Sequence, residues 1–262
     1  MFLRGAVLYY ENMIKIPILA YHSIDDSGSV ISIAPERFRR QMQFLAESSF
    51  NVISLKDVVK HIIEKRMFPE KSLAITFDDG FRNVYDEAYP VLKEYGFRAT
   101  VFLVAGFCGR DNNWNGQPEG IPVMDLLDWD QIKEMAVGGV DFGAHTMNHP
   151  DLSELTPDQA YQEIAESKSE IQKHLGNNVC LFAYPYGSVT RETAKVVEEL
   201  FEGACSTELG FVTPNTSIYS LPRIEMYYFS RNNFFSWMGK PFFHNYLYIR
   251  NAFRFVKSKV SF

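Results

Sequence analysis

The chain has 262 residues, of which 46% are hydrophobic and 22% charged, and its formal net charge is −6. These values suit one globular domain with a full core, and the sequence has no internal repeat or low-complexity tract. The three cysteines, Cys108, Cys180 and Cys205, are widely spaced and form no CxxC pair. We therefore expect free thiols in a reducing compartment rather than a thiolate zinc site or a disulfide framework.

The N-terminal apolar stretch does not resemble a signal peptide. Arg4 interrupts it, and it ends at Glu11 without a small-residue cleavage site. The patterned sequence begins just after Met13, so either Met1 or Met13 could be the true start. No segment is long enough to span a bilayer. We expect a cytoplasmic protein, with peripheral contact at the inner face of the membrane as a further hypothesis.

Strand and helix patterns alternate along the chain. Apolar runs predict strands at residues 15–21, 51–53, 72–77, 99–104, 140–144, 179–184, 203–205 and about 220–224. Helical spacing and capping residues predict helices at residues 34–45, 55–65, 84–95, 130–137, 156–175 and 191–200, with Gly96 ending the third. Residues 106–122 have no periodicity and should form a long loop at the working face. This alternation predicts a parallel α/β fold, either a barrel or an open sheet.

The predicted strand at residues 72–77 ends at two adjacent carboxylates, Asp78 and Asp79, followed by Gly80. Two neighbouring carboxylates repel each other, and a bound divalent cation would compensate them. A turn with an aspartate helix cap is the alternative interpretation.

Other polar clusters follow other predicted strands. His22, the pair His145 and His149, and the tripeptide Pro185-Tyr186-Gly187 all stand at strand ends. In a parallel sheet these ends share one face. The spacing of four between the histidines suits one face of a helix, whereas Gly143, Ala144 and Pro150 favour a tight turn. Two imidazoles and one carboxylate can form a hydrolytic zinc-type site, although two unrelated surface histidines would show the same spacing.

Three motifs in this order resemble the polysaccharide deacetylase family with the NodB homology domain, carbohydrate esterase family four. They are Thr76-Phe77-Asp78-Asp79-Gly80, His145-Thr146-Met147-Asn148-His149-Pro150 and Tyr184-Pro185-Tyr186-Gly187. The resemblance runs from about Ile16 to Ile224. It implies a deformed (β/α) barrel and metal-dependent removal of an N-acyl group, usually acetyl, from an amino sugar. We place this domain at residues 14–228, followed by a tail at 229–262.

The resemblance also implies roles for individual residues. Asp79, His145 and His149 would hold one divalent cation, expected to be Zn²⁺, with Co²⁺, Ni²⁺ or Mn²⁺ as alternatives. Asp78 would be the general base, because one carboxylate holds the cation while the other takes a proton from water. The backbone N–H of Tyr186 would stabilise the oxyanion.

The general acid and its surroundings depart from the usual family pattern. We assign the general acid to His22, which matches a rearranged subgroup, rather than to His244 in the tail. Ala183 occupies the place of an arginine that normally braces the base, and we hypothesise that Arg223 supplies this guanidinium. The fourth motif, an aspartate followed by a tryptophan, is not placed, because Asp128 is better interpreted as a helix cap.

The tail from residue 230 to 262 has six Lys or Arg, no Asp or Glu, and many aromatic residues. This composition suits contact with an anionic membrane surface, or a final helix packed on the barrel. No nucleic-acid motif accompanies it, so we expect no nucleic-acid partner. The expected substrate is an N-acetylated glycan, or a lipid-linked or nucleotide-linked amino sugar. A non-catalytic glycan-binding protein and an amidase on a non-sugar N-acyl substrate are the alternatives.

Overall fold

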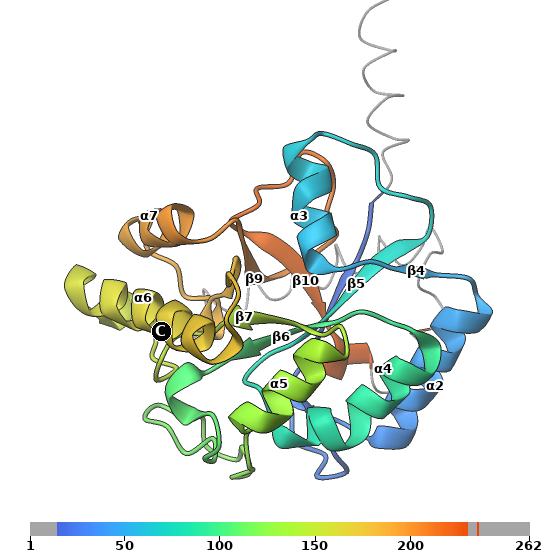
Figure 1. Cartoon of the computed structure of the whole chain (residues 1–262), viewed down its shortest axis with the longest axis horizontal. Coiled ribbons are helices and arrows are strands. Elements are labelled where there is room, and N and C mark those ends of the chain that lie inside the picture. Colours follow the sequence, from blue (N-terminus) through green and yellow to red (C-terminus); the bar gives the residue numbers. More distant parts are fainter. Residues whose placement is uncertain (1–14, 230–234, 236–262) are drawn as a thin grey trace, which may run out of the picture.

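Seven parallel strands close into a barrel in the computed structural model, which describes residues 15–229 and Phe235. The ring is closed because the first strand pairs with both the last strand and the fifth (Figure 1). In ring order the strands are β1 (Ile18–Tyr21), β10 (Leu221–Glu225), β9 (Gly203–Leu209), β8 (Leu181–Ala183), β7 (Asp141–Ala144), β6 (Thr100–Leu103) and β5 (Ser72–Phe77). The expected deformed (β/α) barrel is therefore confirmed, and the open-sheet alternative is excluded.

Three short strands lie outside the ring. β4 (Asn51–Val52) pairs with the first residues of β5. β2 (Ser23–Ile24) and β3 (Ser32–Ile33) form a separate parallel pair just after β1. The loop between them forms part of the rim above the barrel's carboxyl end, where the candidate site is built.

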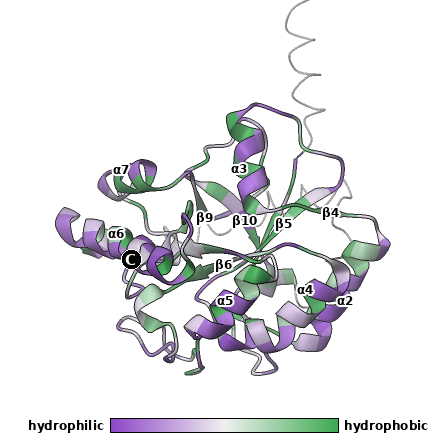
Figure 2. Ribbon diagram, viewed as in Figure 1, coloured by the Kyte–Doolittle hydropathy of each residue, from purple (hydrophilic) through white to green (hydrophobic). Residues whose placement is uncertain are grey.

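Six α-helices among the described residues surround the ring, and Figure 2 shows their mixture of polar and apolar residues. Capping residues fix several ends as the sequence predicts: Thr156 begins the helix at Pro157–Leu175 with a capping box, and left-handed Gly176 ends it. The helices are α2 (Pro35–Glu47), α3 (Leu55–Ile63), α4 (Tyr89–Tyr95), α5 (Trp129–Val137), α6 (Pro157–Leu175) and α7 (Arg191–Leu200).

Two predicted elements differ from the structure. The helix expected at residues 84–95 begins as a π-helical turn, Val84–Ala88, and continues as α4, in whose first turn Pro90 lies; it ends at Gly96 as expected. The strand expected at 203–205 extends to Leu209. Its outer half was missed because Thr207 and Glu208 are exposed and polar, so no apolar run marks them.

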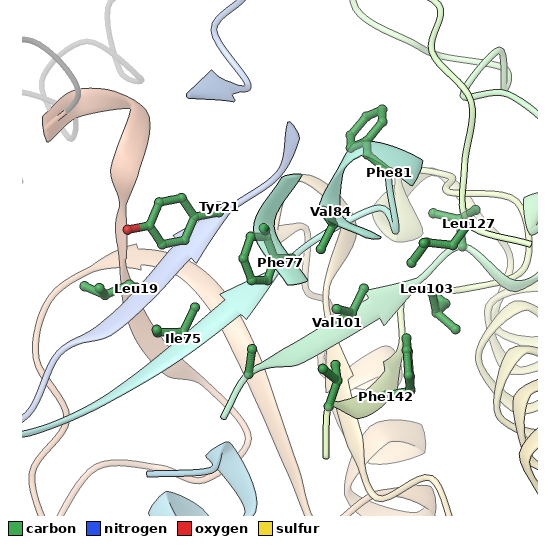
Figure 3. Packing of buried hydrophobic residues seen from close by; sticks show 14 of the residues in the cluster. Leu19, Tyr21, Ile75, Phe77, Phe81, Val84, Val101, Leu103, Leu127 and Phe142 are labelled. Carbon is green, nitrogen blue, oxygen red and sulfur yellow. The ribbon is translucent and has the colours of Figure 1, made fainter. Parts of the chain in front are cut away.

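The core has two layers that follow the alternation of side chains along the strands. One cluster fills the barrel with residues such as Ile18 and Phe102. The larger cluster lies between the barrel and its helices and includes Leu19, Ile75 and Phe77 (Figure 3). Apolar side chains fill the interior of the barrel. The polar side chains of the candidate site lie at the carboxyl ends of the strands.

Most of the tail lies outside the described residues, and so do the domain boundary near residue 14 and His244. Phe235 is described and buried, and its ring packs edge-on against Phe44 of α2, with 5.5 Å between centroids. In the part of the chain that the structure describes, no helix combines the length and apolarity needed to cross a membrane. The three cysteines are free.

Candidate active site

Asp79, His145 and His149 converge at the carboxyl end of the barrel, as the motifs predict. Asp79 Oδ1 lies 3.5 Å from His145 Nε2 and 3.3 Å from His149 Nε2, and the two Nε2 atoms are 3.2 Å apart. All three side chains are buried. Asp79 follows β5 and the histidines follow β7, so two ring strands that are separated only by β6 deliver the three groups.

This donor set fits a divalent cation. His145 Nδ1 lies 2.7 Å from the carbonyl oxygen of Ala183, so Nδ1 carries the proton and Nε2 presents a lone pair. Asp79 Oδ1 is buried without a hydrogen-bond partner. Zn–N bonds of about 2.0–2.1 Å at tetrahedral angles would separate two nitrogen ligands by about 3.3 Å, close to the spacing seen here.

The pKa values agree with this interpretation. Burial lowers the pKa of His149, which keeps its imidazole neutral and able to act as a ligand. Burial alone would raise the pKa of Asp79, but contact with His145 and His149 holds it well below its ordinary value. The carboxylate is thus an anion at neutral pH.

The histidines lie on a turn, not on a helix, which settles the alternative left open by their spacing. The turn contains two left-handed residues, Thr146 (φ 67°) and His149 (φ 58°). Asp79 (φ 70°) and Tyr186 (φ 57°) share this conformation, so four of the seven non-glycine residues with positive φ among the described residues lie in the site. Such strain is unusual for a β-branched threonine and tends to collect at functional sites.

A carboxylate from α6 holds this turn in place, and no local sequence pattern predicts this role. Glu163 Oε2 accepts hydrogen bonds from the backbone N–H groups of Met147, at 3.0 Å, and Asn148, at 2.9 Å. Glu163 Oε1 also accepts a hydrogen bond of 2.6 Å from the Asn148 amide. No motif distinguishes Glu163 from the other acidic residues of the helix, so only the tertiary structure reveals it.

Asp78 forms a buried bidentate ion pair with Arg223 of β10, at the position hypothesised for the missing guanidinium. Both nitrogen–oxygen distances are 2.7 Å. Arg223 also donates to the backbone oxygen of Ser206 and to Thr76 Oγ1. Burial opposes the charge of Asp78, but the guanidinium outweighs it and lowers the pKa of this carboxyl. Asp78 is therefore held ionised and fixed in orientation.

His22 lies between two carboxylates, half-buried at the end of β1. Its Nε2 is 3.8 Å from Asp78 Oδ2, and its Nδ1 is 3.7 Å from Glu225 Oε2. Burial would lower the pKa of His22, but the negative charges of Glu225, Asp78 and Asp79 more than offset this and raise it. The neighbouring carboxylates thus favour the protonated form of the imidazole.

Glu225 is a site residue that sequence reasoning missed. It belongs to β10 and stands two residues after Arg223, so both side chains point to the same side of the strand. Once Arg223 is proposed as a site residue, the alternation of side chains along a strand predicts that Glu225 also faces the site. Glu225 takes the place expected for the carboxylate that accompanies the acid, while Asp128 caps α5 with a capping box, as predicted.

Tyr186 contributes its side chain to the site. Its phenol oxygen lies 3.1 Å from His149 Nδ1 and donates to the carbonyl oxygen of Gly116 at 3.3 Å. The Trp114 ring packs against His149, with 4.5 Å between centroids. The backbone N–H of Tyr186 as an oxyanion donor stays a prediction.

These groups open into one pocket of about 270 Å³. The long loop predicted at the working face supplies one wall through Trp114, Gln117, Pro118 and Ile121. The loop between β2 and β3 supplies Val30. The catalytic candidates therefore lie at the base of a cavity with largely apolar walls.

Comparison with known proteins identifies the family of this chain. Residues 65–201 match the family model for polysaccharide deacetylase. The chain is 31% identical to YxkH of Bacillus subtilis over 217 residues, which are 82% of this chain and 73% of YxkH. It is 30% identical to the poly-β-1,6-N-acetyl-D-glucosamine N-deacetylase of Staphylococcus epidermidis, over 84% of this chain and 77% of that protein.

A solved structure supports the same assignment. The Streptococcus pyogenes deacetylase PplD, determined in complex with acetate, superimposes with a TM-score of 0.72 at 29% identity, covering 82% of this chain and 93% of PplD. The fold, the three motifs and these similarities agree. The chain belongs to the polysaccharide deacetylase family.

Proposed function

We propose that this protein is a metal-dependent N-deacetylase that hydrolyses the acetamide of an N-acetylated amino sugar in a polysaccharide or oligosaccharide. The products are acetate and an amine. The observation that carries this proposal is the convergence of Asp79, His145 and His149 beside the ion-paired Asp78 at the base of one pocket. A glycan precursor linked to a lipid or nucleotide would present the same acetamide.

Asp79, His145 and His149 would hold one divalent cation through one carboxylate oxygen and two Nε2 atoms. When bound, the cation supplies Lewis-acid activation of water and of the amide carbonyl. Zn²⁺ is the expected ion, and Co²⁺, Ni²⁺ or Mn²⁺ could bind the same donors.

Asp78 would accept the proton of the attacking water. Its lowered pKa makes it a weak base but keeps it ionised, and Arg223 keeps its carboxylate in one orientation. His22, 3.8 Å from Asp78, would donate a proton to the leaving amine. Glu225 favours the protonated form of His22 and so supports this role.

The amide oxygen becomes negative as the water adds to the carbonyl carbon. The backbone N–H of Tyr186 would face this oxygen, and the left-handed conformation of Tyr186 sets the direction of the peptide. The apolar and aromatic walls suit the faces of a sugar ring. An N-acetylglucosamine polymer, the substrate named for the staphylococcal relative, is the first substrate to test.

Metal content and acetate release, measured on the same samples, test the proposal. We compare the wild type with His145→Ala and with His61→Gln, a control histidine on α3 outside the pocket. The substrates are β-1,6-linked N-acetylglucosamine oligomers and a small N-acetyl amino acid. We expect one metal per chain and acetate release from the oligomers for the wild type and the control, and loss of both in His145→Ala.

The other outcomes separate the alternatives. Acetate release from the N-acetyl amino acid alone would favour an amidase on a non-sugar substrate. Binding of the oligomers without metal or acetate release would favour a glycan-binding protein. Either result would contradict the proposal.

A further inference from the structure

We propose that the Tyr186 phenol is a positioning residue for His149, and that it links the metal site to the loop that walls the pocket. We call residues 106–122 the wall loop. This inference rests on the proposed function, because it assumes that Asp79, His145 and His149 hold a cation. It concerns the side chain of Tyr186, whereas the oxyanion role concerns its backbone.

The two histidines are supported in different ways. His145 Nδ1 donates directly to the carbonyl oxygen of Ala183 in β8, which is part of the closed barrel. His149 Nδ1 has no such backbone partner among the contacts the structure shows and instead meets the Tyr186 phenol at 3.1 Å. The phenol in turn donates to the carbonyl oxygen of Gly116 in the wall loop, at 3.3 Å. His145 is therefore held by the backbone of the barrel. His149 is held by the Tyr186 side chain, which is itself hydrogen-bonded to the wall loop.

The protons along this chain of contacts are consistent with metal binding. A His149 that binds through Nε2 carries its proton on Nδ1 and donates it to the phenol oxygen. The phenol hydrogen is then free to point to Gly116. Such outer partners fix both the tautomer and the orientation of a ligand imidazole. Without the phenol oxygen, a buried Nδ1–H would lose its acceptor, and the tautomer with the proton on Nε2 would become more favourable.

The wall loop also contacts His149 directly. The Trp114 ring packs on the imidazole at 4.5 Å and 33° between planes. The same loop lines the pocket with Gln117, Pro118 and Ile121. Because one segment contacts both the ligand and the space for substrate, ordering of the loop and binding of the cation should favour each other. Tyr186, which is 41% exposed, is the hydrogen-bonded part of this link.

Metal affinity without any substrate tests the inference. Zn²⁺ is titrated into metal-free protein in competition with a chromophoric chelator, for the wild type, Tyr186→Phe and Tyr161→Phe. Tyr161 is an exposed tyrosine of α6 outside the pocket and serves as the matched control. We expect Tyr186→Phe to weaken Zn²⁺ binding about 10- to 100-fold, the usual effect of losing an outer partner, and the control to match the wild type. Thermal unfolding of the metal-free proteins checks that both variants fold.

Hydrogen exchange provides a readout of the link to the loop. In the wild type, Zn²⁺ should slow amide exchange in peptides from residues 106–122. In Tyr186→Phe saturated with Zn²⁺, this protection should be lost or reduced. Equal protection in the two proteins would overturn the link, and equal Zn²⁺ affinity would overturn the positioning role.

Failure of this inference differs from failure of the proposed function. Tight Zn²⁺ binding by both the wild type and Tyr186→Phe leaves the deacetylase proposal intact and removes only the role of the phenol. A wild type that binds no divalent cation overturns the metal site itself, and this inference with it.

Discussion

At the scale of single residues, the site depends on carboxylates whose neighbours differ. Asp78 faces a guanidinium, Asp79 faces two imidazoles, and Glu225 faces His22, whose Nδ1 lies 3.7 Å from Glu225 Oε2. Burial raises the pKa of Glu225, whereas the pKa values of the two aspartates are lowered by their partners. Environment, rather than residue type, thus gives each carboxylate its function.

A pH profile tests the role of Glu225. A general acid must be protonated, so activity should fall as the pH rises through the raised pKa of His22. Glu225→Gln removes the negative charge closest to Nδ1, which lowers the pKa of His22. The alkaline limb of acetate release against pH should therefore move to lower pH.

Glu208→Gln, an exposed carboxylate on β9 away from the pocket, is the control and should leave the profile unchanged. An alkaline limb that stays in place in Glu225→Gln would show that Glu225 does not tune the acid.

The sequence could predict the residues that stand inside local motifs. Asp78, Asp79, His145 and His149 are marked by their spacing and by the strands that precede them. Glu163 and Glu225 are not, because each acts on a partner that is distant along the chain and carries no motif of its own. Arg223 could be predicted only because Ala183 stands where the family pattern has the arginine that braces the base, so another guanidinium was needed.

At the scale of elements, the turn after β7 has the most unusual backbone in the site. Periodicity predicts helices and strands, but it does not predict a turn with Thr146 and His149 in the left-handed region. Such a turn persists only when its surroundings hold it. Here the Thr146 hydroxyl accepts from the His149 N–H at 3.0 Å, and Glu163 holds the two amides between them.

Glu163→Ala should loosen this turn. The backbone N–H groups of Met147 and Asn148 and the side-chain amide of Asn148 lose a charged acceptor. We therefore expect the free energy of unfolding to fall by about 1–3 kcal/mol. The Zn²⁺ affinity should also fall, because His149 would lose its fixed direction. Chemical denaturation and chelator competition measure the two effects.

Glu166→Ala, an exposed carboxylate on the same helix, should change neither quantity. If Glu163→Ala binds Zn²⁺ as tightly as the wild type, the direction of His149 does not depend on the hydrogen bonds of Glu163 to the turn.

At the scale of the whole molecule, closure of the barrel decides the geometry of the site. β1 pairs with β5 on one side and with β10 on the other. His22 is therefore placed between Asp78 at the end of β5 and Glu225 at the end of β10. Apolar runs predicted the strands, but not the closure, because pairing between strands separated by about 55 and 200 residues leaves no local pattern.

A circular permutant tests whether the ring alone places His22. We would open the chain between the exposed residues Arg66 and Met67 and join the present ends with a flexible linker. Among the ring strands, β5 then comes first and β1 comes last, while every strand keeps its neighbours in the sheet. We expect a protein that folds, binds Zn²⁺ and still releases acetate. A permutant that folds and binds Zn²⁺ without releasing acetate would show that His22 needs the native chain order.

Closure of the barrel also affects how its gene can evolve. On a ring no strand is first, so a gene rearrangement that moves the segment encoding β1 from one end of the coding sequence to the other leaves the neighbours of His22 unchanged. The strand that precedes His22 could thus be encoded at either end of the gene. Alignment by sequence order would separate such descendants, although their active sites superimpose.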